Sequence, residues 1–287
     1  MTAFANHILQ TRFRFAFPAE LSQFWEFTQE LAASGLALDS SPIGIRLGNL
    51  FRAFDRKNSA TNLDELEDRF YKDPPEFITV LLGDTDGLHW GYYVDEPVNG
   101  PSCVAHYYHN DAYQFIVDGG LFDAVGKHAE SVRRSLREYM ETDSASAESY
   151  RQGIQQVDSI LERLVPLMTE EPAQRAATAP TRDGMGIIVP PDKYAPLSGA
   201  ERFLEPRYTP TAAEVHKFRE LALSALQHGY AGTALKLGKD LWDYPDYFDI
   251  SCELLDKAYS ALGSPVLRDR LQKGRENRKK MDAAGNH

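Results

Sequence analysis

The chain has few cysteines and no long apolar run. Only two cysteines, Cys103 and Cys252, occur among its 287 residues, and they are far apart in the sequence. This number and spacing indicate neither a disulfide framework nor a structural zinc site, and they fit a reducing compartment. Nowhere do about 18 apolar residues follow one another, so the sequence predicts no membrane-spanning helix.

The N-terminal stretch also lacks the features of a secretion signal. Its first twenty residues interleave arginines with phenylalanines and contain no continuous apolar run of signal-peptide length. We therefore expect a soluble, cytoplasmic protein that is not secreted and does not associate with membranes.

Basic residues are outnumbered by acidic ones. The chain has 31 Lys and Arg against 42 Asp and Glu, which gives a formal net charge of -11. Such a surface repels nucleic acid unless a basic patch is segregated on one face, so we expect no direct nucleic-acid binding. The sequence also contains no Gly-rich phosphate loop, no GxSxG elbow and no HExxH motif.

One group of residues has the spacing of a metal site but is better explained by packing. Cys103, His106 and His109 form a CxxHxxH pattern within a segment that reads as a strand. On a strand, Cys103 and His109 face one side and His106 the other, so the three side chains do not converge. We expect no metal site.

The first half of the chain predicts helices that flank an antiparallel sheet. Apolar residues recur every three or four positions after Phe17-Pro18, which predicts a helix packed on a core. Residues 61–70 are interpreted as a short acidic helix that ends before Pro74-Pro75. Four β-branched and aromatic segments separated by turn residues predict the strands. They are FITVLLG, HWGYYVDE, SCVAHYYH and AYQFIVDGG.

The second half is mainly helical in pattern. From Leu121 the apolar period changes to that of two successive helices, and residues 169–184 then form a linker or mobile segment with two prolines. One short strand is expected at GMGIIVPP, and helical patterns fill the remainder. We predict an α+β fold with an N-terminal α+β domain over residues 1–145 and a mainly helical C-terminal domain over residues 146–287.

Several blocks of the sequence resemble the histone PARylation factor family. They lie at residues 69–77, 89–97, 184–193 and 235–241, and the last is similar to the LxLGxDL helix of that family. The blocks keep the order and the approximate spacing of the family, and the resemblance covers residues 14–276. The chain is identified as a bacterial-like homologue.

The resemblance implies an accessory protein rather than a complete enzyme. In the family, such a factor docks beside the NAD site of a poly(ADP-ribose) polymerase and contributes a glutamate as the base that activates a serine hydroxyl. A hydroxyl is a weak nucleophile near neutral pH unless a positioned base accepts its proton. The expected partner is therefore a polymerase-like ADP-ribosyltransferase. It binds the NAD, and this chain is expected to be a monomer without a cofactor of its own.

The sequence departs from the family at the catalytic position. The Asp-Glu pair of the family stands twelve residues before the aspartate of LxLGxDL, and counting back from Asp240 reaches Gln227 and His228. The resemblance thus places His228 where the catalytic glutamate would stand. It assigns Gln227, Tyr230, Arg202 and Asp240 to the partner surface.

Three interpretations of His228 follow. Its imidazole could replace the carboxylate as the base, since imidazole accepts a proton near neutral pH. The protein could instead keep the docking surface without base catalysis, or act on a different acceptor. The third interpretation is an exposed histidine at a helix end beside Gly229.

A different class of function competes with the accessory role. The segment HWGYYVDEP also resembles the SUKH superfamily of toxin-immunity proteins, which bind and block a toxin, and an acidic surface would suit a basic toxin. That resemblance covers only the first domain. A stand-alone enzyme is the third possibility, but no complete set of nucleophile, base and orienting group is visible in the sequence.

Overall fold

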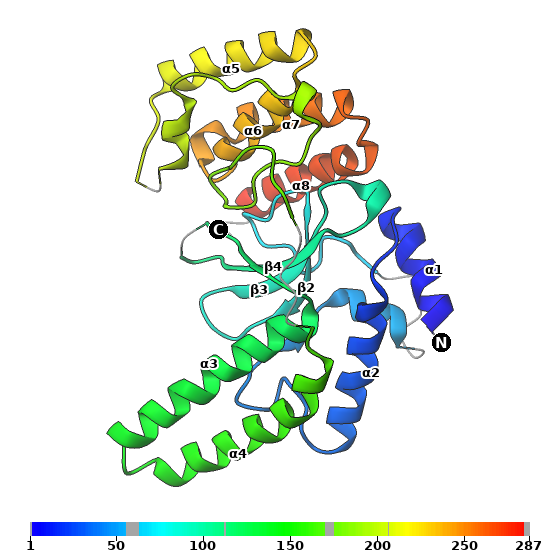
Figure 1. Ribbon diagram of the computed structural model, residues 1–287, viewed down its shortest axis with the longest axis vertical. Coiled ribbons are helices and arrows are strands. Elements are labelled where there is room, and N and C mark those ends of the chain that lie inside the picture. The colour runs from blue at the N-terminus through cyan, green and yellow to red at the C-terminus, as the bar shows by residue number, and fades with distance from the viewer. Residues whose placement is uncertain (1, 56–62, 112, 170–174, 206, 284–287) are drawn as a thin grey trace.

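The computed structural model describes residues 2–55, 63–111, 113–169, 175–205 and 207–283. A five-stranded antiparallel sheet lies in the middle of the molecule, with helices on either side of it (Figure 1). The elements are α1 (Thr2–Phe13), α2 (Ala19–Ala33), β1 (Arg46–Leu47), η1 (Asn49–Phe54), β2 (Phe77–Leu82), β3 (Leu88–Tyr93), η3 (Pro97–Asn99), β4 (Cys103–Tyr108), β5 (Ile116–Asp118), α3 (Leu121–Thr142), α4 (Ala147–Leu164), η4 (Val165–Leu167), η5 (Pro191–Lys193), η6 (Ala200–Leu204), α5 (Ala212–Gln227), α6 (Ala231–Leu241), η7 (Pro245–Tyr247), α7 (Phe248–Ala261) and α8 (Pro265–Ala283). The predicted α+β class is confirmed.

The strands follow one another in sequence order across the sheet, from β1 to β5. The four predicted strand segments are confirmed as β2 to β5. Two-residue β1 was not predicted, because so short a strand carries no alternating pattern. The turn between β2 and β3 uses Asp86 and Gly87 at φ values of 50° and 67°, a left-handed geometry that glycine adopts without strain.

Each face of the sheet packs on its own hydrophobic core. Ile78, Trp90 and Val104 belong to the core shared with α1 to α4. Phe77 and Tyr107 belong to the core that the C-terminal helices complete. Because both faces are covered, the central strands are buried along most of their length, which is why their sequences are rich in apolar and aromatic residues on both sides.

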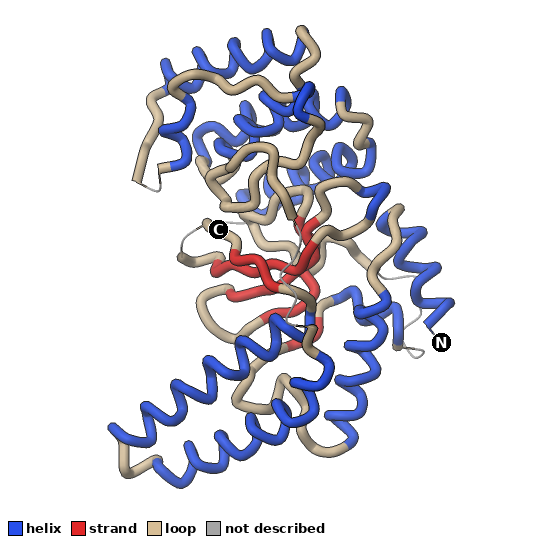
Figure 2. The backbone as a smooth tube through the Cα atoms, in the orientation of Figure 1, coloured by secondary structure: helices blue, strands red, loops and turns tan. Residues whose placement is uncertain are grey.

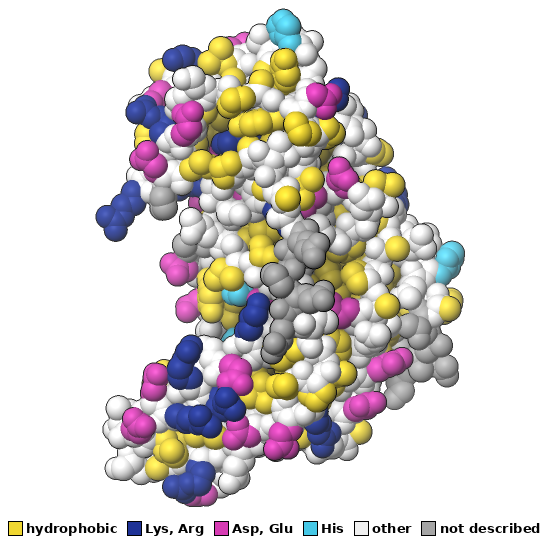
Figure 3. Space-filling view, viewed as in Figure 1, with side chains coloured by type: hydrophobic (Ala, Val, Ile, Leu, Met, Phe, Trp, Pro, Cys, Tyr) yellow, Lys and Arg dark blue, Asp and Glu magenta, His cyan; other side chains and the backbone are white. Residues whose placement is uncertain are grey.

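The helices divide into two groups around the sheet. The α3–α4 hairpin extends away from the sheet on one side, and α5 to α8 form a compact group on the other (Figure 2). Over the hairpin, basic and acidic side chains are interspersed on the face shown in Figure 3. Among the described residues, no helix combines the length and the hydropathy needed to cross a bilayer.

The predicted acidic helix at residues 61–70 is wrong for the part that the structure describes. Residues 61 and 62 lie outside the described residues, and residues 65–68 form turns. The acidic side chains there have tertiary partners: the Asp68 carboxylate accepts a hydrogen bond from the backbone N–H of Asn49, and Glu65 pairs with Arg270 at 3.3 Å. These contacts outweigh a weak local helical preference.

The segment between the two helical groups is only partly described. Residues 170–174 of the predicted linker lie outside the described residues, and Arg175, which follows them, pairs with Asp95 at 2.5 Å. At the predicted short strand, pairing is confined to one β-bridge between Ala179 and Ile187. The division into domains at residue 145 stays a prediction.

On β4, the side chains of the CxxHxxH pattern alternate as expected for a strand. Cys103 is buried in the core of the C-terminal helices. His106 lies on the other face, where its Nδ1 contacts a carboxylate oxygen of Asp118 at 2.7 Å. Cys103 thus packs in a core, while His106 contacts an acidic side chain on the other face.

A buried carboxylate organises the centre of the sheet. Asp73 is 1% exposed and accepts hydrogen bonds from His89 Nε2 at 2.9 Å, the Tyr107 hydroxyl at 2.7 Å, the Thr79 hydroxyl at 3.1 Å and the backbone N–H of Phe70 at 2.9 Å. Burial alone would raise the pKa of the Asp73 carboxyl, but the charge and hydrogen bond of His89 hold it below its ordinary value. The carboxylate therefore joins three strands, β2, β3 and β4, and the loop before β2.

We predict that Asp73→Ala lowers the free energy of unfolding by about 3–5 kcal/mol, because it leaves His89 and Tyr107 buried without their shared acceptor. Urea denaturation followed by circular dichroism measures the change. The control is Asp192→Ala, since the Asp192 side chain is 75% exposed and should change stability by no more than about 0.5 kcal/mol. A similar loss in both variants would contradict the prediction.

Candidate functional site

The C-terminal end of α5 carries the residues that the sequence singled out. The helix begins at a capping box, in which the Glu214 carboxylate accepts a hydrogen bond from the Thr211 backbone N–H at 3.0 Å and the Thr211 hydroxyl accepts one from the Glu214 N–H. The Thr211 hydroxyl also donates to the Glu214 carboxylate at 2.7 Å, and the bond from the Thr211 N–H together with this one lowers the pKa of Glu214 to about 2. The cap fixes where the helix starts and so fixes which residues reach its far end.

The helix ends at Gln227, and His228 is its C-terminal cap residue. Gly229 follows at a φ of 93°, with open space where a side chain would stand, and Tyr230 N–H bonds back to the Ala225 carbonyl at 3.0 Å. A glycine in left-handed geometry is the common way to end a helix and reverse the chain. The turn therefore presents Gln227, His228 and Tyr230 together at the surface, where all three are exposed.

One ring nitrogen of His228 is committed to the helix. Nδ1 lies 2.8 Å from the backbone carbonyl oxygen of Ser224. A carbonyl oxygen can only accept, so Nδ1 carries the hydrogen and donates it. In the neutral ring, Nε2 then holds the free lone pair. The exposed side of the imidazole is thus set up to accept a proton.

Tyr230 contributes an apolar surface beside this histidine. Its side chain is 38% exposed, which is high for an aromatic residue of a packed helical group. Partly exposed tyrosines are common at protein interfaces because they combine a large ring with a hydrogen-bonding hydroxyl.

Arg202 lies at the opposite end of α5. Its guanidinium donates a hydrogen bond to Glu214 at 2.7 Å and lies over the Tyr208 ring, with 5.1 Å to the ring centroid. Glu214 and His228 are separated by the length of the helix, about 20 Å at 1.5 Å per residue. The structure therefore does not bring Arg202 together with His228, and only an interface as long as α5 could include both.

Asp240 is completely buried and is not part of the surface. It accepts hydrogen bonds from the backbone N–H of Arg182 at 2.9 Å and from Lys236 Nζ at 2.6 Å. The expectation that the Asp240 side chain contacts a partner directly is therefore wrong. Burial raises the pKa of Asp240 to about 6 in spite of the Lys236 ion pair.

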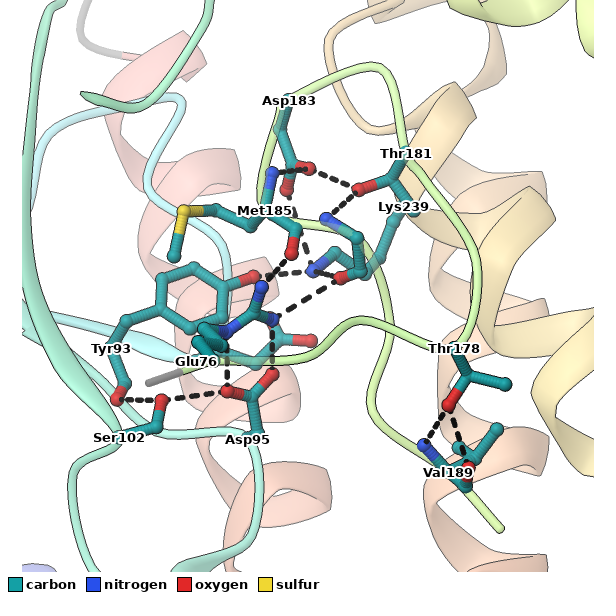
Figure 4. A network of polar contacts seen from close by, with 12 residues as sticks. Glu76, Tyr93, Asp95, Ser102, Thr178, Thr181, Asp183, Met185, Val189 and Lys239 are labelled. Atoms are coloured by element: carbon teal, nitrogen blue, oxygen red, sulfur yellow. Dashed lines mark hydrogen bonds and ion pairs between the residues drawn. The ribbon is translucent and has the colours of Figure 1, made fainter. Parts of the chain in front are cut away.

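Behind the turn, a polar network joins α6 to the sheet (Figure 4). Lys239 on α6 is 3% exposed; its amino group donates to the Tyr93 hydroxyl and to the Gly186 carbonyl oxygen at 2.7 Å, and it lies 3.5 Å from the Asp183 carboxylate. The ion pair of Arg175 with Asp95 lies beside it. The network supports α6, on whose N-terminal side the exposed turn sits.

The groups that hold the site in place were not predicted from the sequence. The Thr-x-x-Glu pattern at Thr211 and Glu214 is a visible capping signal that could have located the start of α5. Neither the buried position of Lys239 nor the bond from His228 to the Ser224 carbonyl has such a signal, because both depend on tertiary or backbone geometry.

Comparison with known proteins relates this chain to a single family, both through a family model and through individual relatives. The model of the histone PARylation factor 1 family matches residues 5–205. The chain is 25% identical over 309 residues to histone PARylation factor 1 of Bos taurus, with 96% of this chain and 87% of the relative covered. It is also 25% identical over 291 residues to histone PARylation factor 1 of Mus musculus, with 88% and 81% covered.

We predict that Asp240→Asn changes how stability depends on pH. The folded pKa of about 6 lies above the unfolded value near 4, so the folded state binds this proton more tightly. The free energy of unfolding of the wild type should therefore fall by an amount on the order of 2 kcal/mol as the pH rises from about 4 to about 6, from this group alone. The variant should lack that decrease.

Urea denaturation at a series of pH values measures this difference. The matched control is Asp246→Asn on η7, where the side chain is exposed and the wild-type pH profile should be kept. Parallel profiles for the wild type and the Asp240 variant would refute the prediction.

Proposed function

The chain belongs to the histone PARylation factor 1 family, and on that basis we propose that it is an accessory factor for ADP-ribosylation. It binds a poly(ADP-ribose) polymerase-type ADP-ribosyltransferase and helps to complete the active site of that enzyme for serine modification. The partner binds the NAD, and this chain supplies a group that its partner lacks. One chain acts on one partner.

The arrangement of His228 carries this proposal. The imidazole is exposed at the α5–α6 turn, and the bond from Nδ1 to Ser224 leaves Nε2 as the proton acceptor. A serine hydroxyl needs such an acceptor when its oxygen bonds to the ribose carbon from which nicotinamide leaves. His228 Nε2 takes the hydroxyl proton in that step, in place of a carboxylate.

The neighbouring side chains would contact the partner around this base. Gln227 and Tyr230 flank His228 and are exposed with it, and the apolar face of Tyr230 suits a site from which water is excluded on docking. Asp240 acts from inside the protein by holding the 181–184 turn against α6.

The immunity alternative receives less support. The second resemblance was confined to the sheet region, whereas the family match continues through residue 205 and the alignments to relatives extend over 96% and 88% of the chain. The proposed accessory role accounts for the C-terminal helices as well as for the sheet.

We predict that His228→Ala lowers the rate of serine modification at least about 100-fold, because loss of a general base typically costs a factor of 10²–10⁴. The assay combines this chain with the catalytic domain of a poly(ADP-ribose) polymerase, NAD and a serine-containing peptide. His216→Ala is the matched control, since His216 is also exposed on α5 but lies about three helical turns away from His228.

The same assay distinguishes the remaining interpretations of His228. A wild-type rate in His228→Ala with unchanged binding would exclude the histidine as the base. Binding by the wild-type chain without any stimulation would leave a docking protein that has lost catalysis, and no binding would reject the accessory role.

We predict separately that Tyr230→Ala weakens binding to the partner about tenfold, because an exposed tyrosine at the centre of an interface often contributes more than 1 kcal/mol. Surface plasmon resonance with the same catalytic domain measures the dissociation constant. Tyr139→Ala on α3 is the control, since Tyr139 is 55% exposed but lies on the α3–α4 hairpin. Equal affinities for the Tyr230 variant and the wild type would remove this residue from the interface.

A further inference from the structure

A second surface lies between the sheet and the C-terminal helices. A pocket of about 580 Å³ opens between η3, residues 187–190, α6 and the turn between α7 and α8. Sites of about 300–1,000 Å³ bind ligands in known proteins. Neither His228 nor Tyr230 lines this pocket, so it is distinct from the exposed turn.

One wall of the pocket is an extended segment that is bonded along a single edge. The Ile187 N–H donates to the Ala179 carbonyl oxygen at 2.9 Å, and the Ile187 carbonyl oxygen accepts from the Thr178 N–H at 2.7 Å. The Val189 N–H and carbonyl oxygen both bond to the Thr178 hydroxyl. Successive residues of an extended chain direct their backbone groups to opposite edges, so Ile188 directs its N–H and carbonyl oxygen the other way.

The free edge at Ile188 belongs to the pocket. Ile188 lines the pocket, whereas the segment that bonds to its two neighbours does not. Among the residues that the structure describes, neither backbone group of Ile188 has a hydrogen-bond partner. An unpaired N–H and C=O on an extended segment are a template for another extended chain, because main-chain hydrogen bonds can continue across them.

The other walls of the pocket suit apolar side chains. They come from η3, α6 and the α7–α8 turn, and include Val98, Leu235, Leu262 and Pro265. Val98 at the rim is 90% exposed. An apolar strand laid against Ile188 would cover these surfaces and remove them from water.

Three of the charged residues that line the pocket are held by contacts inside the protein. Glu76 and Lys239 are each 3% exposed, and Glu76 accepts a hydrogen bond from the Tyr259 hydroxyl. The Asp95 side chain is 8% exposed and pairs with Arg175 at 2.5 Å. These groups therefore contribute little to the recognition of a ligand.

The other three charged residues lie at the rim, and two of them lack a close partner of opposite charge. Arg14 pairs with Asp269 at 2.7 Å. Glu96 is exposed and has no ion pair within the described part of the chain. The Lys193 side chain is 47% exposed, and the carboxylate that it contacts, that of its neighbour Asp192, is 3.8 Å away.

These two rim charges lie near opposite ends of the extended segment. Lys193 follows the segment at the end of η5. Glu96 follows Asp95, and Arg175 joins Asp95 to the Met185 carbonyl oxygen just before the segment begins. A strand added along Ile188 would thus meet a basic group at one end and an acidic group at the other.

We propose that this pocket binds an extended segment of another protein, which adds to residues 187–189 as an antiparallel strand. In an antiparallel pair, one residue of the segment exchanges both hydrogen bonds with Ile188. Apolar side chains on either side of that residue contact Val98 and Leu235. An acidic residue precedes the apolar stretch and lies beside Lys193, and a basic residue follows it and lies beside Glu96. This binding does not depend on the accessory role in ADP-ribosylation, and either can fail without the other.

The test compares the peptide acetyl-Glu-Val-Thr-Val-Lys-amide with an analogue in which ester oxygens replace the three central N–H groups. Titration into the full chain, followed by amide NMR, should show the peptide binding about fivefold more tightly, as expected for loss of a hydrogen bond. The amide of Ile188 should shift on binding, and its hydrogen exchange should become slower, because its N–H becomes bonded.

A third probe tests the charges at the rim. The peptide acetyl-Lys-Val-Thr-Val-Glu-amide has the same composition with its charges exchanged. It should bind about threefold more weakly than the first peptide at low salt, because each end then meets a like charge.

Two variants connect the binding to the pocket. Val98→Asp places a charge on the apolar rim and should weaken binding of the first peptide at least about fivefold. Val165→Asp on η4 is the matched control, since Val165 is 52% exposed and does not line the pocket, and it should leave the affinity unchanged. Thermal melting checks that both variants are folded.

The proposal is overturned by any of four results. These are equal affinity for the first peptide and its ester analogue, no binding at millimolar concentration, chemical shifts centred away from residues 187–190 and 262–266, and equal or tighter binding of the charge-exchanged peptide. If Val98→Asp does not fold, the comparison of the peptide with its ester analogue decides the outcome.

Discussion

The buried amino group of Lys239 is the constraint on which the rest of the structure depends. An ammonium at 3% exposure must have acceptors on several sides, and it finds them on β3, on the 183–186 segment and at the Asp183 carboxylate. These acceptors come from β3 and from the 183–186 segment, which are far apart in sequence from each other and from α6. Satisfying one side chain therefore fixes α6 against the sheet and places both the exposed turn at one end of α6 and the pocket along its side.

The exposed turn at the start of α6 and the pocket along its side both depend on the position of α6, but they differ in what they present. At the turn, the backbone of α5 holds a histidine whose outer nitrogen faces solvent, and the chain contributes a single group to chemistry that would take place on a partner. In the pocket along α6, the lining residues come from η3, residues 187–190 and the α7–α8 turn, so this chain alone supplies the surface. The turn needs a second protein to complete a site, whereas the surface of the pocket is already complete.

The sequence predicted the elements better than it predicted the site. Periodic apolar residues located α2 to α8 but not α1, and alternating ones located β2 to β5, because burial on one or both faces dictates those patterns. The acidic residues near position 65 were misjudged, since Glu65 and Asp68 serve distant partners rather than a local helix. Asp240 was assigned to the surface from its motif, yet its role is internal. Such assignments depend on tertiary contacts, and a pattern along one chain does not contain them.

The way α5 ends has a consequence for how its tip can change. Gly229 makes the reversal, and nothing packs within 4 Å of the place where a side chain on it would stand. His228 caps the helix through its bond to the Ser224 carbonyl oxygen, and the rest of its ring is exposed together with Gln227. Because Gly229 makes the reversal, the side chain at position 228 can change from a carboxylate to an imidazole without altering the path of the backbone.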